Sequence, residues 1–418
     1  MTEPSLVDFE TALSIARDIA AGALWSGEAC AFLGAVAPES MGGPARHAVL
    51  GGDLYEGSAG IARFLALVAR LSGDDVLRRS ALGAARHGLA RTEGWSLFTG
   101  RMGAGLVALE VAAALDEPAL VQPGVEAIET ASEIALGEAK QAPSDFLVGL
   151  AGVVVGLIEA LPYDLDGGWR ARAFVLGRAL LGAARPVPTG LAWPMLPGGA
   201  EHLCGLAHGA AGVALALEGL AGLAPQERGW AEAAAAARGY ERGWFSPAHG
   251  SWVDLREATL ASHQRSCPHF WCHGSVGIGQ ERLRAMRRCE DPLCRADAAA
   301  ALAGAMAEAE RMLALPAGPG GSDRTNGSLC HGIGGLVELL AEAWQVQRDE
   351  TLVALMRRLT AFIRNDAGPA RRWRSGIPGG GPATPGLMLG SAGIGWAMLR
   401  AWAPEDVPPG WMPRTMTD

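Results

Sequence analysis

Cysteine and histidine stand side by side at two places in the sequence, each time followed by glycine. The triplet "CHG" occupies residues 272–274 and again residues 330–332. Thiolate sulfur and imidazole nitrogen are common protein ligands of zinc, and three protein ligands leave a fourth position open, which suits catalysis. Cys272, Cys330 and His331 are therefore a candidate zinc site. The alternative is two small buried cysteines and a histidine that packs in the core, but it does not explain why the triplet recurs.

Both triplets belong to a longer repeat. Seven stretches have the pattern Gly-x-x-Gly at the start of an apolar run. Their first glycines are Gly57, Gly100, Gly149, Gly209, Gly274, Gly332 and Gly390. The intervals of 43 to 65 residues leave room for one further helix and its loops. A supersecondary unit that recurs in this way is typical of repeat architectures.

The runs after the glycine pairs are uniformly apolar and therefore predict buried helices. Stretches between them, such as "LRRSALGAARHGLA" and "ADAAAALAGAMAEAERML", predict amphipathic helices. The N-terminal "LVDFETALSIARDIAAGAL" would be the partner that precedes the first unit. We predict an all-α fold of seven helical hairpins, about fourteen helices, with an inner ring of apolar helices inside an outer ring. The pattern leaves open whether the array closes or remains an open solenoid.

The residues just before each glycine pair would lie at equivalent places in such an array. Helix starts carry N–H groups and partial positive charge, and glycine permits close approach of the backbone. Histidine and cysteine are concentrated here in units four, five and six, at Ala207-His208, Cys272-His273 and Cys330-His331. If the ring closes, these positions face a shared centre. Tyr55 and Glu56 hold the same place in unit one, without an assigned role.

Three residues near this register are candidates for proton transfer. His208 could act as a general acid or base, because histidine titrates near neutral pH; its alternative role is to cap or pack at the helix start. Asp145, four residues before Gly149, could orient His208 or cap its own helix. His273 could donate a proton or support a metal ligand, and a solvated loop histidine is the alternative.

The other cysteines and nearby histidines are predicted to be bystanders. The chain has seven cysteines, an odd number with uneven spacing, which argues for thiols or metal ligands over a disulfide framework. Trp271 is expected to pack against its loop. The predicted bystanders are Cys204, Cys267, His202 and His269, and the predicted inert thiols are Cys30, Cys289 and Cys294.

Composition excludes several classes of function. The net charge of −9 offers no basic surface for nucleic acid. The acidic start "MTEPSLVDFE" lacks a signal-peptide pattern. The longest apolar run, about "LVGLAGVVVGLI", is shorter than the roughly 18 residues of a membrane span. We therefore expect a cytoplasmic protein without a membrane span.

At these residues the chain resembles the lanthionine synthetase C (LanC) family. The matching blocks are "WCHG" at 271–274, "CHG" at 330–332, "GLAHGAAG" at 205–212 and "DFLVG" at 145–149. The resemblance covers nearly the whole chain. "SWVDLR" at 251–256, "SLCHG" at 328–332 and "TPGLMLGSAGIGWAMLRAWAPEDVP" at 384–408 are similar to the cyclase domain of the bifunctional LanM synthetases. We expect a stand-alone cyclase, because the repeats begin within the first ~60 residues.

The resemblance implies an α/α toroid, here a single domain over residues 1–418, that binds one Zn²⁺ through Cys272, Cys330 and His331. It implies that a cysteine thiol of a dehydrated precursor peptide adds to dehydroalanine or dehydrobutyrine and forms a lanthionine or methyllanthionine ring. A separate dehydratase would be a partner. Zinc favours the thiolate at neutral pH. The enolate formed by the attack needs a proton at its α-carbon, for which His208, held by Asp145, is the candidate.

The chain departs from the family pattern at two positions. LanC enzymes usually carry arginine four residues before the first zinc cysteine and tyrosine directly after it, where this chain has Pro268 and His273. The groups that stabilise and protonate the enolate therefore stay open. Two other functions are also considered: a non-catalytic scaffold that binds a precursor peptide, and an enzyme that adds a small thiol such as glutathione to dehydroamino acids.

Overall fold

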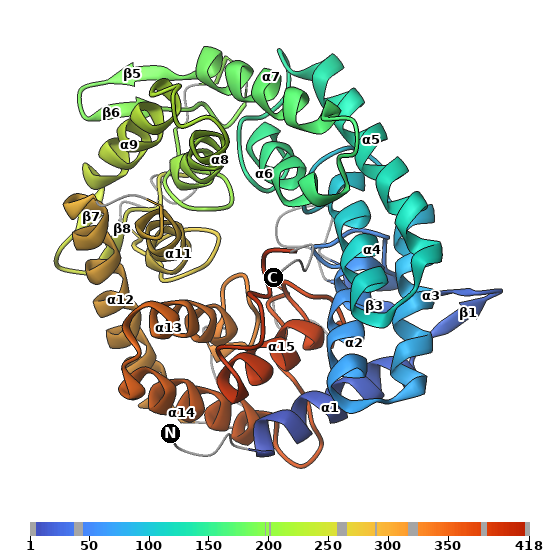
Figure 1. Cartoon of the computed structure of the whole chain (residues 1–418). Helices are drawn as coiled ribbons and strands as arrows, with labels where there is room; N and C mark the ends of the chain where they lie inside the picture. Colours follow the sequence, from blue (N-terminus) through green and yellow to red (C-terminus); the bar gives the residue numbers. More distant parts are fainter. Residues whose placement is uncertain are drawn as a thin grey trace. The chain divides into compact units, whose positions relative to one another are not determined.

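The structure is a computed structural model. It describes residues 6–36, 45–196, 198–199, 202–256, 266–288, 291–316, 325–377 and 383–413. Within these ranges the chain forms fourteen α-helices and eight short β-strands (Figure 1), so the predicted number of helices is confirmed. Among the described helices, none is both long enough and apolar enough to cross a membrane.

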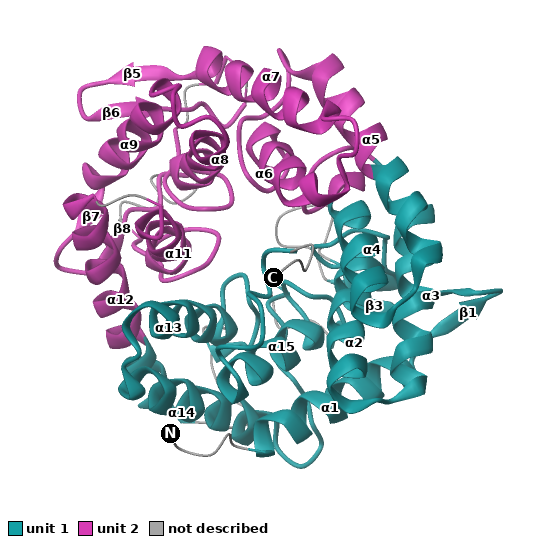
Figure 2. Cartoon of the chain, in the orientation of Figure 1, with its two compact units in different colours: residues 1–93, 103–127, 309–418 teal, residues 94–102, 128–308 magenta. Residues whose placement is uncertain are grey.

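The chain divides into two compact units, coloured separately in Figure 2. Unit 1 comprises Met1–Glu93, Gly103–Ala127 and Ala309–Asp418. Unit 2 comprises Gly94–Met102 and Ile128–Glu308. The prediction of a single domain over the whole chain stays a prediction.

Six whole helices of unit 1 pack as hairpins. They are α1 (Leu6–Ala21), α2 (Ser58–Ser72), α3 (Asp75–Arg91), α13 (Ile333–Gln347), α14 (Glu350–Ala367) and α15 (Ser391–Trp402). Helices α2, α13 and α15 each begin directly after the first glycine of a repeat, and α15 packs against the other two. Helix α3 packs on α2 and α14 on α13. The N-terminal α1, expected as the partner of the first unit, packs mainly on α15 and less on α2. The first and last helices of the chain therefore pack as a pair.

Unit 2 repeats this arrangement with five whole helices. They are α6 (Leu150–Ala160), α7 (Gly168–Ala183), α8 (Ala210–Leu223), α9 (Gly229–Arg242) and α11 (Ser275–Met286). Helices α6, α8 and α11 begin directly after a repeat glycine, and α8 packs against both of its neighbours. Helices α7 and α9 pack on α6 and α8, and Figure 1 shows both on the same side of that row.

Three helices contain residues of both units. They are α4 (Arg101–Leu115), α5 (Val121–Glu138) and α12 (Pro292–Leu313). Helix α4 begins after Gly100, so all seven glycine pairs open a helix, as predicted. Two short 3-10 helices, η1 (Pro118–Leu120) and η2 (Leu161–Tyr163), lie in connecting segments.

Among the residues that the structure describes, four antiparallel strand pairs, which the sequence did not predict, lie between helices. In the first, Trp25 pairs with Cys30, and in the second, Gly34 pairs with Ala48. The strands are β1 (Leu24–Ser26), β2 (Ala29–Ala31), β3 (Leu33–Val36), β4 (Arg46–Val49), β5 (Arg185–Val187), β6 (Gly190–Ala192), β7 (Phe245–Ser246) and β8 (Ser251–Trp252).

Close packing explains the glycine pairs better than unusual backbone angles do. The first glycine of most pairs has an extended backbone; Gly149, for example, has φ −113°. A Cβ on Gly149 would lie 2.4 Å from the Pro143 carbonyl oxygen, and one on the second-position Gly277 would lie 2.0 Å from that of Trp271. Neither space admits a side chain. The pair therefore lets each buried helix start against the loop that precedes it.

The same loops bind the first N–H groups of these helices. The N–H of Leu150 donates to Pro143 O (2.9 Å), and that of Ala210 donates to Leu203 O (3.1 Å). In both cases the acceptor lies seven residues earlier, and α2, α13 and α15 show the same spacing. These N–H groups are thus used within the protein, which corrects the expectation that they are available to a ligand.

Candidate active site

The residue two places before the first glycine of each repeat, the register residue, takes part in a chain of backbone hydrogen bonds. In unit 2, the N–H of Phe98 donates to Leu147 O (3.2 Å), that of Leu147 to Ala207 O (3.0 Å) and that of Ala207 to Cys272 O (3.3 Å). These residues come from four successive repeats. Within this unit, the register residues of successive repeats therefore lie next to one another, at equivalent places as the sequence predicted.

Unit 1 has the same feature at its own register residues. The N–H of Cys330 donates to Met388 O (3.0 Å), and that of Met388 donates to Tyr55 O (2.8 Å). The backbone of Met388 therefore binds both Tyr55 and Cys330. Because the bonds involve only the backbone, the side chains at this register are free to differ between repeats.

His208 and Asp145 form a hydrogen-bonded pair in unit 2. The Nδ1–H of His208 donates to Asp145 Oδ2 at 2.9 Å, and the other carboxylate oxygen accepts the N–H of Val148 at 2.7 Å. The Asp145 side chain is 3% exposed and that of His208 is 26% exposed. Asp145 therefore orients the imidazole and binds the backbone before its helix. It does not cap the helix, because the N-cap residue is Gly149 and the helix start receives no side-chain hydrogen bond.

The pair makes His208 a better proton carrier. Burial alone would lower the pKa of His208, but the hydrogen bond and the charge of Asp145 outweigh it and raise the pKa above the ordinary value. With Nδ1–H committed to Asp145, proton exchange falls to Nε2. This is the arrangement in which a carboxylate fixes the tautomer of a catalytic histidine.

His273 lies beside this pair but is buried. Its ring centroid is 6.0 Å from that of His208, and its Nδ1 lies 3.4 Å from Cys204 O. Burial lowers its pKa below the ordinary value, so the neutral form is favoured. The alternative of a solvated loop histidine is wrong, because only 3% of His273 is exposed.

A buried carboxylate holds the loop that carries His208. Glu241 on α9 accepts the N–H of Gly205 at 2.9 Å and that of Ala211 at 3.0 Å through the same oxygen, Oε1. These two residues stand three places on either side of His208. Glu241 therefore fixes both ends of the loop while leaving the histidine side chain to Asp145.

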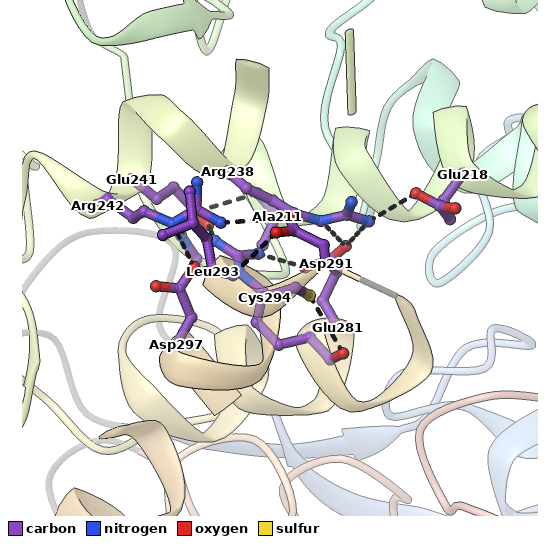
Figure 3. Close-up of polar contacts among 12 residues, drawn as sticks. Ala211, Glu218, Arg238, Glu241, Arg242, Glu281, Asp291, Leu293, Cys294 and Asp297 are labelled. Atoms are coloured by element: carbon purple, nitrogen blue, oxygen red, sulfur yellow. Dashed lines mark hydrogen bonds and ion pairs between the residues drawn. The ribbon is translucent and has the colours of Figure 1, made fainter. Parts of the chain in front are cut away.

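An ionic network surrounds Glu241 (Figure 3). Arg282 on α11 donates to Glu241 Oε2 (2.8 Å) and to Asp297 Oδ2 (3.1 Å), and it also pairs with Glu281. Arg238 on α9 donates to Glu281 Oε1 and to Glu218 Oε2. The Arg282 side chain is fully buried. The network thus ties the His208 loop to α11, the helix that follows Cys272.

The pKa values of two carboxylates in this network are shifted in opposite directions. Burial alone would raise the pKa of Glu281, but the charges of Arg238 and Arg282 hold it below the ordinary value. For Glu241, burial outweighs the charge of Arg282 and raises the pKa. Removing an arginine here would leave buried acids without compensation.

In unit 1, Cys330 is buried and accepts a hydrogen bond. The phenol O–H of Tyr55 donates to Cys330 Sγ at 3.0 Å, and only 2% of Cys330 is exposed. The sulfur of a cysteine binds metal as the thiolate, and the Tyr55 O–H is a donor to it. The donor comes from the first repeat, to which the sequence assigned no role.

His331 has one ring nitrogen committed to the backbone. Its Nε2–H donates to Gly376 O at 2.7 Å, which places the lone pair on Nδ1. A metal-binding histidine commonly donates its other N–H to a carbonyl or carboxylate in this way. His331 therefore fits a metal ligand that binds through Nδ1.

The loop around His331 is fixed by neutral groups. Asn326 accepts the N–H of Ser328 through Oδ1 at 3.0 Å, and the N–H of Ile333 donates to Asn326 O at 2.9 Å. Ser328 Oγ in turn accepts the N–H of His331 at 3.4 Å.

Glu56 is a half-buried acid of unit 1. Its Oε1 accepts the N–H of Leu389 at 2.6 Å, while Asp53 accepts the N–H of Glu56 at 2.9 Å. Burial raises the pKa of Glu56 to about 8, and the charge of Asp53 adds to the effect. Glu56 thus holds the Tyr55 loop to the segment that contains Met388.

The predicted bystanders have structural partners. No disulfide joins the six cysteines that the structure describes; Cys289 lies outside the described residues. Several of these side chains or backbones form hydrogen bonds. Trp271 packs on Phe98 of the second repeat, with ring centroids 5.2 Å apart. The hydrogen bonds are Cys30 Sγ to Ser80 O, Cys294 Sγ to Arg282 O, His269 Nδ1 with Ser275 Oγ, and Tyr240 O–H to His202 O.

Among the candidate metal ligands, Cys272 belongs to unit 2, whereas Cys330 and His331 belong to unit 1. Sequence reasoning missed Glu241, Arg282 and Gly376, for which no local pattern gave a signal. The repeat register did single out Tyr55, but it did not indicate that Cys330 is its partner.

Comparisons with known proteins show which family and fold the chain resembles. It matches the lanthionine synthetase C-like protein family over residues 48–411. Among solved structures it is similar to nisin cyclase, with a TM-score of 0.61, 17% identity and coverage of 83% of this chain and 88% of that one. This likeness confirms the predicted fold class, all-α of the α/α-toroid type.

Other solved structures are more distant. The Lin0763 protein from Listeria innocua has a TM-score of 0.48, 11% identity and coverage of 72% of this chain and 83% of that one. The GH76A α-1,6-mannanase from Salegentibacter has a TM-score of 0.46, 11% identity and coverage of 94% and 97%. No curated protein matched the chain. Because the family match spans most of the sequence, the chain belongs to the lanthionine synthetase C-like family.

Proposed function

We propose that the chain is a zinc-dependent lanthipeptide cyclase. It would add cysteine thiols of a dehydrated precursor peptide to dehydroalanine or dehydrobutyrine and so form thioether rings. Family membership and the fold shared with a protein described as nisin cyclase support this. The observation that carries it is the 2.9 Å pair of His208 and Asp145, because it supplies proton transfer at the register of the candidate metal ligands.

The residues present fit a zinc ion. Cys272, Cys330 and His331 are a group that could hold a metal, and two thiolates with one imidazole are a common zinc donor set. The Gly376 carbonyl leaves the lone pair of His331 on Nδ1. A bound zinc would lower the pKa of the substrate thiol, so that the thiolate is present at neutral pH.

The addition needs no further reactant. The thiol loses its proton, its sulfur forms a bond to the β-carbon, and the electron pair of the double bond becomes an enolate that takes a proton at the α-carbon. His208 Nε2 is the proposed proton donor. Asp145 keeps the imidazole in the tautomer and orientation that this step needs, and it stabilises the imidazolium.

The site also implies what must act earlier. Dehydroalanine and dehydrobutyrine do not occur in a newly made peptide, so serine and threonine must first lose water. We propose that a separate dehydratase supplies this substrate. The precursor peptide is then the partner that both enzymes share.

The proposal is tested with a dehydrated, cysteine-containing peptide. Ring formation does not change the peptide mass, so remaining thiols are alkylated with N-ethylmaleimide and counted by mass spectrometry. The native chain should remove thiols much faster than buffer alone, and Cys330→Ala should not. Glutathione added in excess distinguishes the small-thiol enzyme, which would give a glutathione adduct instead of a ring. Binding of the peptide with no loss of thiols would contradict the proposal and favour a scaffold.

A further inference from the structure

Tyr55 occupies the register position of the first repeat, the position that holds Cys330 in the sixth. Its carbonyl oxygen accepts the N–H of Met388, whose own carbonyl accepts the N–H of Cys330. One residue along, Glu56 binds the N–H of Leu389 through Oε1. The Tyr55 carbonyl and the Glu56 side chain are therefore both tied to residues 388–389, and Met388 in turn binds Cys330.

This placement brings the phenol to the sulfur of a candidate metal ligand. Tyr55 Oη lies 3.0 Å from Cys330 Sγ, with the O–H as donor, although the two residues are 275 positions apart in the sequence. Cys330 is buried, which strengthens a hydrogen bond to its sulfur relative to one in water.

We propose that Tyr55 is a positioning residue for the metal site: its O–H bond to Cys330 sulfur orients this ligand and withdraws electron density from it. A site with two thiolates concentrates negative charge, and a donor to one of them offsets part of that charge. The bond also fixes the rotamer of Cys330. The inference rests on the zinc site of the proposed function, but its test does not need a peptide substrate.

The chain offers two natural comparisons, because it contains only three tyrosines. Tyr240 donates its O–H to the His202 carbonyl, and Tyr163 ends the 3-10 helix η2. Of the three, Tyr55 alone stands at a repeat register position. A purely structural role for Tyr55 would predict no coupling between its ring and the metal.

The first experiment measures metal binding by the native chain, Tyr55→Phe and the control Tyr163→Phe. Phenylalanine keeps the ring and removes the O–H. Zinc affinity, measured by competition with a chromogenic chelator, should fall roughly 10- to 100-fold in Tyr55→Phe only. In the Co²⁺ form, the sulfur-to-cobalt charge-transfer band should move to longer wavelength, because the sulfur lone pairs lose a stabilising hydrogen bond. Thermal unfolding of the metal-free proteins shows whether each variant folds.

A second measurement uses the native sequence and so does not depend on a variant. In protein labelled with 3-fluorotyrosine, the ¹⁹F resonance of Tyr55 should shift on addition of Zn²⁺, while those of Tyr163 and Tyr240 stay in place. The inference would be overturned if Tyr55→Phe bound zinc with native affinity and its cobalt band did not move. A Tyr55 resonance that does not shift on addition of zinc would also overturn it. Failure of the native chain to bind either metal would overturn the proposed function as well, which separates the two failures.

Discussion

The two loops that carry the candidate chemistry are held by different forces. In unit 2, the His208 loop is fixed at both ends by Glu241, whose other oxygen binds the fully buried Arg282. In unit 1, the loop of Cys330 and His331 is fixed by neutral groups, chiefly Asn326. The His208 loop therefore depends on buried charge, whereas the loop of Cys330 and His331 depends on amide and hydroxyl contacts. Changes of charge should damage the first far more than the second.

The largest effect on stability is expected for Arg282→Ala. It leaves Glu241, Glu281 and Asp297 without their shared cation in a buried place, so the free energy of unfolding should fall by about 3–5 kcal/mol. Chemical denaturation measures this. Arg358→Ala is the matched control, because Arg358 pairs with Glu310 at the surface. If the two variants unfold alike, the contrast between buried and exposed charge fails.

Replacing His208 should have the largest effect on activity. In His208→Asn, the rate of thiol loss from the dehydrated peptide should fall roughly 10²- to 10⁴-fold, because the proposed proton donor is gone. Zinc content should remain as in the native chain. His249→Asn is the control, since His249 is exposed and its ring bonds to nearby Ser246. A His208→Asn variant of native rate would remove His208 from the mechanism.

How much of the fold and of the candidate site could be predicted depends on how far apart in the sequence the contacting residues are. The glycine pairs predicted all seven helix starts, because close packing at a helix start needs glycine in every repeat. The pairing of His208 with Asp145 was one of two roles that the sequence left open for this aspartate. Glu241 and Arg282 did not, since a charged residue on an amphipathic helix gives the same pattern whether it meets water or a buried partner. The β-hairpins were missed because each strand has only two to four residues.

The Glu241 contacts allow a more selective change within unit 2. Glu241→Gln keeps the shape of the side chain but removes the charge that binds Arg282, and should lower the free energy of unfolding by about 1–3 kcal/mol. The amides of Gly205 and Ala211 should then exchange faster with deuterium than those of Ile333 and Ser328 in unit 1. Equal acceleration in both units would show a general loss of stability and no specific support of the His208 loop.

The raised pKa of His208 predicts a pH effect. Because Asp145 raises this pKa, the imidazolium persists to higher pH than in an ordinary histidine, and activity that needs the proton is lost as pH rises through that pKa. In Asp145→Asn the pKa should fall, so the alkaline limb of the rate profile should move to lower pH. Titration of the His208 ring by NMR checks the assignment. An unchanged alkaline limb would mean that another group supplies the proton.

A further pH effect concerns Glu56 in unit 1. Its pKa in the folded chain is about 8, above the ordinary value, so the folded state holds a proton that the unfolded state releases above pH ~4.3. Stability should therefore fall as pH rises from about 5 to 8. Glu56→Gln should reduce this slope, as measured by denaturation at several pH values. A slope equal to that of the native chain would show that Glu56 does not contribute to it.

The central claim is that Cys272, Cys330 and His331 hold one metal ion. Zinc per chain should be measured on native protein purified under reducing conditions without chelator, beside Cys272→Ala and Cys330→Ala. We predict about one zinc ion in the native chain and much less in each variant. No zinc in the native chain, or full retention in either variant, would contradict the claim.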